Sequence, residues 1–465
     1  MSIIEQWRLR ARFARRLSTM YGREVPAYTT LVEVSEEVNR DVVGRDGDRA
    51  QRLGTIGRIT AERHGAIRVG TPAELAQVAR IFGALGMRPV GFYDLREAAS
   101  SAVPVISTAF RPIDADELAR NPFRVFTSML TPADPRFFSP DLRARLETFL
   151  AGRELFGPEL LALADRAEAG RGLPEADAER FLDLAVGAFE LSAEPVDRAW
   201  YAELEAVSAV AADIGGVRST HINHLTPRVL DIDDLYRRMT ERGIEMIDTI
   251  QGPPRWRGPD VLLRQTSFRA LAEPRAMREA DGTINTGALR VRFGEVEARG
   301  VALTPEGRSL YDRLLTEIDR TLAGSPGRSR TDVAVDVWER GLPDTEAGLR
   351  ERGLAYFTYA AGHGHAGGVP PESLSDLVEQ GWVTATPIVY EDFLPRSAAG
   401  IFQSNLSGEG SRDTRAEAVE YDQDWLAGAI GRDIHNPFHL YAREQAASLE
   451  TVATTLNLTT LKDVP

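Results

Sequence analysis

The sequence predicts an α+β protein in which one structural unit occurs twice. Two stretches, 51–135 and 216–300, each follow the order strand, helix, strand, strand, strand, and their lengths are nearly equal although little residue identity connects them. Segments rich in Leu, Ala and Glu, which are typical of helices, precede, separate and follow the two stretches. We therefore expect a duplicated βαβββ half-barrel that is surrounded by helices.

Residues 1–50 are expected to form N-terminal helices. The first of them carries apolar residues at helical spacing, namely Ile4, Trp7, Phe13, Leu17 and Tyr21. This spacing favours a packed amphipathic helix over an arginine-rich organellar presequence. A second helix is predicted over 30–43.

The first repeated unit begins with a short β-like run at 64–69. Thr71-Pro72-Ala73-Glu74 then has the pattern of a helix start: a capping Thr, a Pro at the first helical position and a Glu three residues after the Thr. Gly86 is expected to end this helix. Three strands should follow, over 90–95, 103–110 and 123–130.

A helical insertion is predicted over 136–215, between the two units. The second unit should begin with a strand at 221–226, followed by a helix that starts at Asp231 and ends at Gly243. Its remaining strands are expected over 244–250, 261–271 and 289–297. We expect residues 301–465 to form a cover of helices and strands that contributes to the pocket.

Composition and charge exclude several classes of protein. The 465 residues carry a net charge of -14, which argues against a nucleic-acid partner. No apolar run reaches the ~18 residues of a membrane span, and the N-terminus lacks the apolar core of a secretion signal, so we expect a cytoplasmic protein without a membrane partner. Because the chain has no cysteine, a metal would have to bind to His and carboxylate side chains, which suit Fe(II), Mn(II) or Zn(II).

Two of the seven histidines, His221 and His224, fall within one short segment. The β-branched Thr220 and Ile222, with Pro227 closing the segment, favour a strand. Side chains at these two positions would then point to opposite faces of that strand. We therefore expect at most one of the two histidines to face a given pocket.

A metal site is predicted where the two units meet. His64 begins the first strand of one unit and His224 lies in the first strand of the other, so a pseudo-twofold arrangement would bring them together. A third ligand should come from a neighbouring last strand, where Glu295 and Glu297 share a face and periodicity does not choose between them. Two His and one carboxylate form the facial triad of non-haem iron oxygenases, which leaves positions open for a chelating substrate and O2.

Other interpretations of the histidines stay open. His221 competes with His224 as the ligand, and a hydrogen-bonded structural His pair is the alternative to a metal site. His363 and His365 lie on a glycine-rich tract, where we expect solvated or lid residues. The remaining pair, at 435 and 439, is expected to cap or pack a helix end.

Four segments resemble the bacterial 2-oxoadipate dioxygenase/decarboxylase family, formerly a domain of unknown function; they lie at 64–68, 220–228, 293–300 and 390–406. The resemblance covers nearly the whole chain, and the fixed order of the four segments makes it specific. The family is related to the vicinal oxygen chelate fold. The Phe-Gly-Glu and Asn-His-Leu segments are also similar to the ligand strands of 4-hydroxyphenylpyruvate dioxygenase and hydroxymandelate synthase.

The resemblance implies a role for individual residues. It places His64, His224 and Glu295 on the metal positions of an Fe(II) enzyme. Arg68 falls on the catalytic position that is implied to bind the substrate carboxylate, which suits a guanidinium because two parallel charge-assisted hydrogen bonds fix the direction of the acid.

The turn near residue 396 is implied to contact the substrate as well. Ser397 and the Arg396 backbone fall in that turn. Arg396 departs from the pattern of the family, in which we expect a small apolar residue, so its side chain would alter how the far end of the substrate is held.

The resemblance also implies a reaction. A small 2-oxo dicarboxylic acid, 2-oxoadipate, would react with O2 to give 2-hydroxyglutarate and CO2, a step of bacterial lysine breakdown. Two alternatives remain: a non-oxidative metal-dependent isomerase or lyase on the same fold, and a protein that binds a small acid without turnover. Consumption of O2 together with the substrate would distinguish the dioxygenase from both alternatives.

Overall fold

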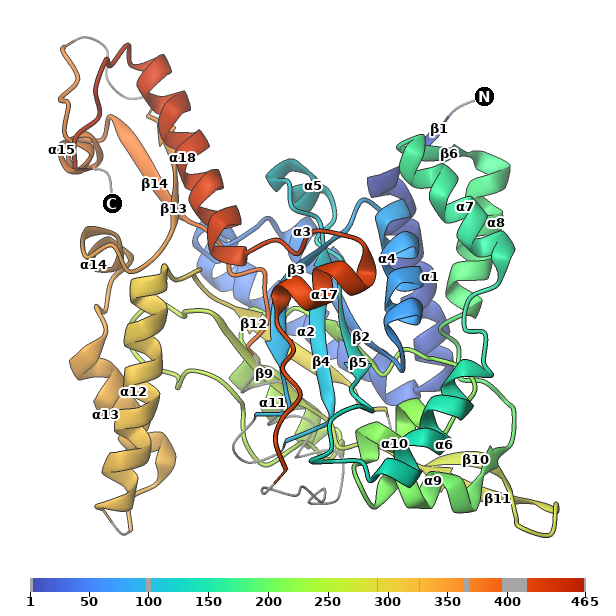
Figure 1. The fold of residues 1–465 in the computed structure, drawn as a ribbon. Helices are drawn as coiled ribbons and strands as arrows, with labels where there is room; N and C mark the ends of the chain where they lie inside the picture. The colour runs from blue at the N-terminus through green and yellow to red at the C-terminus, as the bar shows by residue number, and fades with distance from the viewer. Residues whose placement is uncertain are drawn as a thin grey trace.

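A five-stranded sheet lies near the middle of the protein (Figure 1). Strands β2 and β5 are parallel and the other neighbours are antiparallel. The computed structural model describes residues 3–97, 102–290, 292–325, 327–362, 368–394 and 416–463. The strands, in spatial order, are β3 (Arg88–Asp94), β4 (Val105–Arg111), β5 (Arg124–Leu130), β2 (Arg63–Val69) and β8 (His224–Pro227).

Strand β8 connects this sheet to a smaller one. In the smaller sheet, β9 (Leu263–Ser267) and β12 (Glu295–Arg299) pair antiparallel. An isolated parallel bridge between Arg228 and Glu297 places β12 beside the end of β8. Strands β2, β8 and β12 are therefore neighbours in space although they lie far apart in the sequence.

Helices cover both faces of the five-stranded sheet. One face packs against α1 (Gln6–Glu24), α2 (Pro26–Asp46), α4 (Pro72–Ala84), α7 (Pro158–Ala169) and α8 (Glu175–Gly187). Near the other face lie α6 (Pro140–Ala151), α9 (Arg198–Glu205) and α10 (Ala209–Gly215). Along β2, Ile67 and Val69 join the first core and Ala66 joins the second, as strand alternation requires.

A third core holds the C-terminal part of the chain together. Figure 1 shows this part standing beside the central sheet, with α12 and α13 below and α18 above. Its elements are α12 (Pro305–Ala323), α13 (Arg330–Gly341), α14 (Glu346–Glu351), β13 (Phe357–Ala361), α15 (Leu374–Glu379), β14 (Val383–Pro387) and α18 (Pro437–Thr455). Helix α17 (Gln423–Ile430) instead joins the first core through Leu426 and Ile430. The shorter remaining elements are β1 (Ile3–Glu5), η1 (Gly47–Gln51), α3 (Ile56–Ala61), α5 (Ala115–Arg120), β6 (Gly172–Pro174), β7 (Val196–Asp197) and α11 (Ile232–Glu241).

The predicted helix start at Thr71 is confirmed in detail. The Thr71 hydroxyl accepts a hydrogen bond from the Glu74 backbone N–H at 3.1 Å, and the Glu74 carboxylate accepts one from the Thr71 N–H at 3.2 Å. This reciprocal pair satisfies two backbone donors that the helix itself cannot satisfy. The helix ends at Ala84, and Gly86 follows with a φ of +72°.

The second unit differs from its predicted strand order. Residues 244–250 form no regular strand: Met246 makes an isolated bridge to Phe268, and Gln251 just beyond makes one to Gln265. The reason is that only the consecutive Met246 and Ile247 are buried in this stretch, so alternate residues do not face one core.

A hairpin also occupies the second unit where none was predicted. Strands β10 (Glu273–Arg278) and β11 (Ile284–Leu289) lie between β9 and β12 in the sequence and pair antiparallel with each other. The predicted strand 289–297 is replaced by β12, which starts only at Glu295. Most residues of β11 are exposed, so their burial pattern carried little signal in the sequence. The mixed α+β class is correct, whereas the limits of the predicted units remain predictions.

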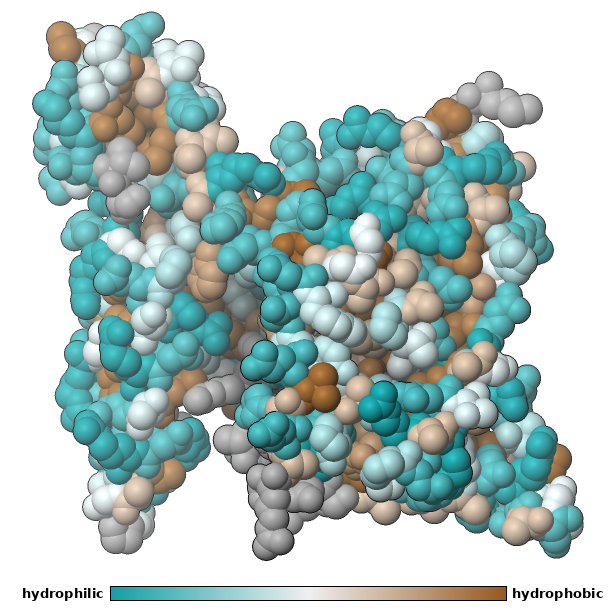
Figure 2. Space-filling view, in the orientation of Figure 1, coloured by the Kyte–Doolittle hydropathy of each residue, from teal (hydrophilic) through white to brown (hydrophobic). Residues whose placement is uncertain are grey.

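Figure 2 shows hydrophilic residues over most of the viewed face. Among the helices that the structure describes, none has both the length and the apolar character that crossing a bilayer requires.

Candidate metal centre

The structure brings the three predicted ligands together. One donor atom from each of His64, His224 and Glu295 lies within 4.8 Å of the other two, and all three residues are buried. Nε2 of His64 is 3.8 Å and Nε2 of His224 is 3.4 Å from the Glu295 carboxylate oxygens. Among the described residues, these three form the group of His and carboxylate side chains with metal-binding spacing.

Strand register explains why the two imidazoles meet. Residue 64 pairs with Thr226 and Ala66 pairs with His224 across the β2–β8 ladder, so the two histidines lie on a diagonal of one sheet face. Their ring centroids are 5.3 Å apart. The segment that enters β12 passes close to Phe268, which follows β9, and this close approach depends on Gly294, since a Cβ there would fall 1.9 Å from the Phe268 ring. Glu295 follows that glycine directly and reaches the same point.

The two acidic candidates on β12 have different positions relative to His64. Glu295 lies near Nε2, whereas Oε2 of Glu297 lies 2.9 Å from Nδ1, close but not aligned as a hydrogen bond. A carboxylate beside Nδ1 favours a proton there and leaves the Nε2 lone pair for a metal. For His224, Nδ1 lies 3.0 Å from the Thr226 hydroxyl, which again leaves Nε2 for the centre.

Burial sets the protonation of these groups. It lowers the pKa of His64, although Glu297 opposes the shift, and it lowers the pKa of His224 well below the ordinary value. Both rings are therefore neutral at neutral pH, which is the form that binds metals. Burial and then the like charge of Glu297 raise the pKa of Glu295 well above its ordinary value. A cation between the three side chains would relieve both effects, so the donor set fits a divalent metal.

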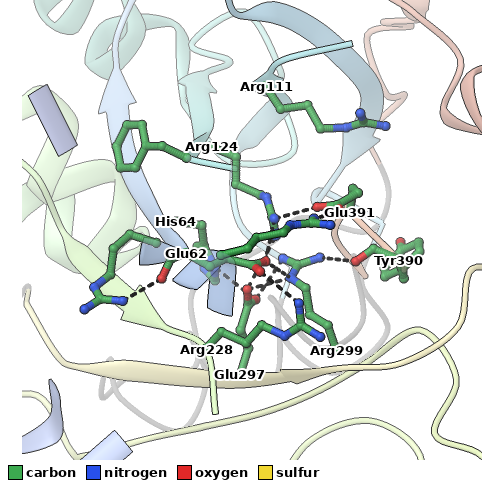
Figure 3. A network of polar contacts seen from close by, with 12 residues as sticks. Glu62, His64, Arg111, Arg124, Arg228, Glu297, Arg299, Tyr390 and Glu391 are labelled. Carbon is green, nitrogen blue, oxygen red and sulfur yellow. Dashed lines mark hydrogen bonds and ion pairs between the residues drawn. The ribbon is translucent and has the colours of Figure 1, made fainter. Parts of the chain in front are cut away.

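A network of buried charges lies behind His64 (Figure 3). Arg299 donates to both oxygens of Glu297, at 2.6 and 2.9 Å, and Arg124 donates to Glu62 and Glu391, each at 2.6 Å. Burial would raise the pKa of Glu297, but Arg299 and His64 outweigh it and hold that pKa well below its usual range. Because opposite charges compensate one another here, Glu297 remains anionic beside the imidazole.

A second polar cluster surrounds Arg68, which lies on the same face of β2 as His64. Its guanidinium pairs with Asp213 of α10, and Asn223 donates to the same carboxylate oxygen at 2.9 Å. His221 lies 3.3 Å from the other Asp213 oxygen. Burial lowers the pKa of His221 to about 4 despite Asp213. His221 thus belongs to the Arg68 cluster, and His224 is the histidine that joins Glu295.

Several predicted residues fall elsewhere. Arg396 and Ser397, like His363 and His365, lie outside the described residues. Phe393, the last aromatic residue before that turn, packs edge-on against His64 with ring centroids 5.0 Å apart, and it also lines a cavity of about 480 Å³. The helix-end histidines at 435 and 439 lie away from the centre, the first bridging Val90 of β3 and the second exposed on α18.

Sequence reasoning missed Asp213, Asn223 and Phe393 as parts of this region. Asn223 and Phe393 stood in segments that resemble the family, 220–228 and 390–406, but neither residue was given a role. Asp213 carried no signal, because its partner Arg68 is 145 positions away and the contact depends on how α10 packs against β2.

Comparisons with known proteins point to one family. A family model described as 2-oxoadipate dioxygenase/decarboxylase matches residues 13–405. A protein of that name from Mycobacterium tuberculosis is 59% identical over 438 residues, which cover 94% of this chain and 96% of the relative. Another from Pseudomonas putida is 41% identical over 461 residues, covering 97% of both chains.

A solved structure gives the same result for the fold. The crystal structure of hydroxyglutarate synthase in complex with 2-oxoadipate from Pseudomonas putida superposes with a TM-score of 0.85 at 39% identity, covering 98% of this chain and 100% of that one. Both the family model and the relatives extend over most of the sequence. The chain therefore belongs to the 2-oxoadipate dioxygenase/decarboxylase family.

Proposed function

We propose that this protein is an Fe(II)-dependent dioxygenase and decarboxylase that converts 2-oxoadipate and O2 into 2-hydroxyglutarate and CO2, a step of lysine breakdown. The observation that carries the proposal is the convergence of His64, His224 and Glu295 in a buried site of a chain that belongs to this family. The reaction is balanced: one oxygen atom of O2 enters the new carboxylate and the other enters the new hydroxyl group.

The three side chains would hold the metal on one face and leave other positions for ligands. Iron bound there supplies a Lewis-acidic, redox-active centre at which a 2-oxo acid and O2 can react. The chain contributes neutral imidazoles, one carboxylate and a water-poor surrounding. Phe293 stacks on His224 with ring centroids 5.2 Å apart, and Phe393 covers His64, so two aromatic rings shield the centre.

Arg68 would bind the distal carboxylate of the substrate. It shares a strand face with His64, and Asp213 fixes the direction of its guanidinium. Five N–H donors allow one arginine to hold Asp213 and a substrate acid at the same time. Fixing both ends of a dicarboxylate determines which carbon lies at the metal, which matters when the oxidant reacts with the molecule that generated it.

The proposal includes the turn that contains Arg396 and Ser397. Phe393, the last described aromatic residue before these two positions, packs against His64, and this contact supports including them in the proposal. We propose that Ser397 and the Arg396 backbone contact it, and that the Arg396 side chain modifies the far end of the pocket. We also propose that the two sheets form a vicinal oxygen chelate-like half-barrel and that the enzyme acts in the cytoplasm.

The test is a product analysis with iron-reconstituted protein. Metal-free protein is loaded with Fe(II) without oxygen, mixed with a panel of 2-oxo acids of different chain length, and exposed to air in an oxygen electrode. We expect one O2 consumed and one CO2 released per 2-hydroxyglutarate formed. Turnover without O2 would instead indicate an isomerase or lyase, and unchanged ligand without O2 uptake would indicate a binding protein.

Three substitutions connect the activity to the geometry. His224→Ala should lose metal and activity together, whereas His221→Ala should retain stoichiometric iron because His221 belongs to the Arg68 cluster. Arg68→Lys should retain iron and bind 2-oxoadipate more weakly. Loss of iron from Arg68→Lys with unchanged substrate affinity would contradict the assignment of that residue.

A further inference from the structure

A smaller cavity, of about 230 Å³, lies apart from the metal centre. Its walls come from β7, α9, the start of the segment leading into β8, and β10 of the hairpin at the lower right of Figure 1. The liners include Arg275 from the hairpin and Trp200 from α9. Neither a metal-centre residue nor Arg68 lines it. We refer to it as the Arg275 cavity.

Arg275 is buried, with 8% of its surface exposed. Within the described chain it makes no side-chain hydrogen bond and no ion pair, and its Nε is a buried donor without an acceptor. Glu273 and Glu24 are the carboxylates with the strongest electrostatic effect on Arg275, but both form their ion pairs with Arg292.

A buried guanidinium without a partner is costly. Arginine does not lose its proton in proteins, so it cannot escape the cost by becoming neutral. Other buried arginines of this chain have carboxylates within reach; Arg299, for example, donates to both oxygens of Glu297, at 2.6 and 2.9 Å. A buried guanidinium that lines a cavity, and that the described residues leave without a carboxylate, is therefore suited to an anion from outside the described part of the chain.

The other liners indicate what kind of anion fits. Phe149, Trp200 and Val196 give apolar walls, and the exposed Arg218 and Arg278 add positive charge at the rim. Arg218 lies over the Phe149 ring at 5.5 Å. Two acidic residues also line the cavity: Glu194 is exposed, and Asp197 is used to cap α9 through the Trp200 N–H at 2.9 Å. Apolar walls around a guanidinium suit an organic carboxylate better than phosphate, which has no apolar surface.

We propose that the Arg275 cavity is a binding site for a small organic carboxylate, anchored by Arg275. The site is separate from the proposed metal centre, but one of its walls belongs to the segment that leads to Thr220 and contacts Arg68. The cavity wall at 216–219 continues into Thr220, whose hydroxyl donates to the Arg68 backbone carbonyl at 2.7 Å. A bound carboxylate would thus order the segment that supports Arg68, while the site itself does not depend on the reaction at the metal.

The experiment measures binding of glutarate to the full-length protein by calorimetry. Glutarate is a dicarboxylate without a 2-oxo group, so it cannot chelate a metal through a keto acid. Arg275→Met should weaken binding at least about tenfold, because a charge-assisted hydrogen-bonded pair is lost. The matched control is Arg290→Met, because Arg290 is exposed and does not line the cavity. This variant should bind glutarate with the affinity of the wild type.

A variant of Arg68 distinguishes the two carboxylate sites. Glutarate affinity that survives in Arg68→Met and falls in Arg275→Met supports the proposal. The opposite pattern places the acid at Arg68 and overturns it, as does the absence of glutarate binding to the wild type. Inorganic phosphate that binds as tightly as glutarate overturns the assignment to an organic carboxylate.

Thermal unfolding gives a second readout. Without ligand, Arg275→Met should melt at a higher temperature than the wild type, since a lone buried charge has been removed, and glutarate should no longer raise its melting temperature. A lower melting temperature together with an unchanged glutarate response would mean that Arg275 is only structural. If Arg275→Met does not fold, the exposed rim variant Arg278→Met should fold normally and bind glutarate several-fold more weakly; unchanged affinity there would overturn the proposal.

Discussion

Arg124 and Arg275 are both buried arginines, but they differ in whether a carboxylate of the described chain pairs with them. Arg124, behind the metal centre, donates to Glu62 and Glu391, while Arg275 lines a cavity without a carboxylate partner in the described chain. The first guanidinium belongs to a network in which charges compensate one another (Figure 3). The difference shows that burial of charge serves two purposes here.

Compensated charges fix the position of other groups. Each carboxylate of the network is held by at least one arginine, and Glu62, for instance, has a pKa of about 2 because Arg228 and Arg124 outweigh its burial. Such a network resists rearrangement and holds Glu297 beside His64. An uncompensated charge fixes nothing by itself and remains ready to bind.

The largest effect is expected when the network loses an arginine. Arg124→Met leaves Glu62 and Glu391 buried with fewer partners, and breaking a buried ion pair costs about 3–5 kcal/mol. The free energy of unfolding in urea, measured on metal-free protein, should fall by that amount. Arg275→Met is the matched comparison, with the same substitution at another buried site, and it should not destabilise the protein. Equal losses in both variants would show that the two arginines are not different.

The next effect concerns the position of His64. Glu297→Gln should weaken metal affinity about 10–100-fold, because the partner that orients the imidazole and favours its Nδ1 proton is changed. Metal titrations with a chelator as competitor measure this affinity. Glu295→Gln is the control on the same strand, and it should abolish stoichiometric metal binding. If Glu297→Gln loses the metal completely while Glu295→Gln retains it, the two glutamates have been assigned the wrong way round.

A smaller effect should appear at the Arg68 cluster. Asp213→Asn removes the charge that directs the Arg68 guanidinium, and we expect the KM for 2-oxoadipate to rise about tenfold with little change in iron content. Steady-state oxygen uptake measures KM and kcat separately. A fall in kcat with an unchanged KM would mean that Asp213 acts at the metal centre rather than through substrate binding.

The sequence was sufficient to predict that His64 and His224 meet a carboxylate of β12, because strand patterns carry positional information. His64 and His224 occur in short β-like runs, and adjacent first strands bring such residues together. The choice between Glu295 and Glu297 could not be made in the same way. Both point to one side of β12, and what separates them is which nitrogen of the His64 ring each one approaches. That is a property of three strands together, which no single stretch of sequence contains.

The Arg275 cavity and the Asp213 contact were beyond sequence reasoning for a related reason. Arg275 lies on a hairpin whose partner strand β11 is mostly exposed, so no alternation revealed it. Its burial comes from elements distant in sequence, such as α9 and β7. A side chain that is buried by tertiary packing alone has no local pattern to reveal it.

The smallest effect is expected at a half-buried charge cluster near the surface, which shows how depth changes the result. Glu168 of α7 accepts hydrogen bonds from Arg432 at 2.6 and 2.7 Å and from Arg88 at 2.8 Å. The hydrogen bonds from Arg432 hold the pKa of Glu168 below its ordinary value, against partial burial. A depressed folded-state pKa contributes stability above the ordinary pKa, and this stability disappears as the pH falls through the folded-state value.

Glu168→Gln should therefore lower the free energy of unfolding by only about 1 kcal/mol at neutral pH, since pairs of this exposure are screened by solvent. The difference from the wild type should shrink as the pH falls below the ordinary carboxylate pKa and through the lower folded-state pKa, because Glu168 then becomes protonated in both states. Urea midpoints at a series of pH values measure this difference, with the exposed Glu190→Gln as the control variant. A loss at neutral pH as large as that of Arg124→Met would mean that compensation, and not burial depth, sets the strength of these clusters.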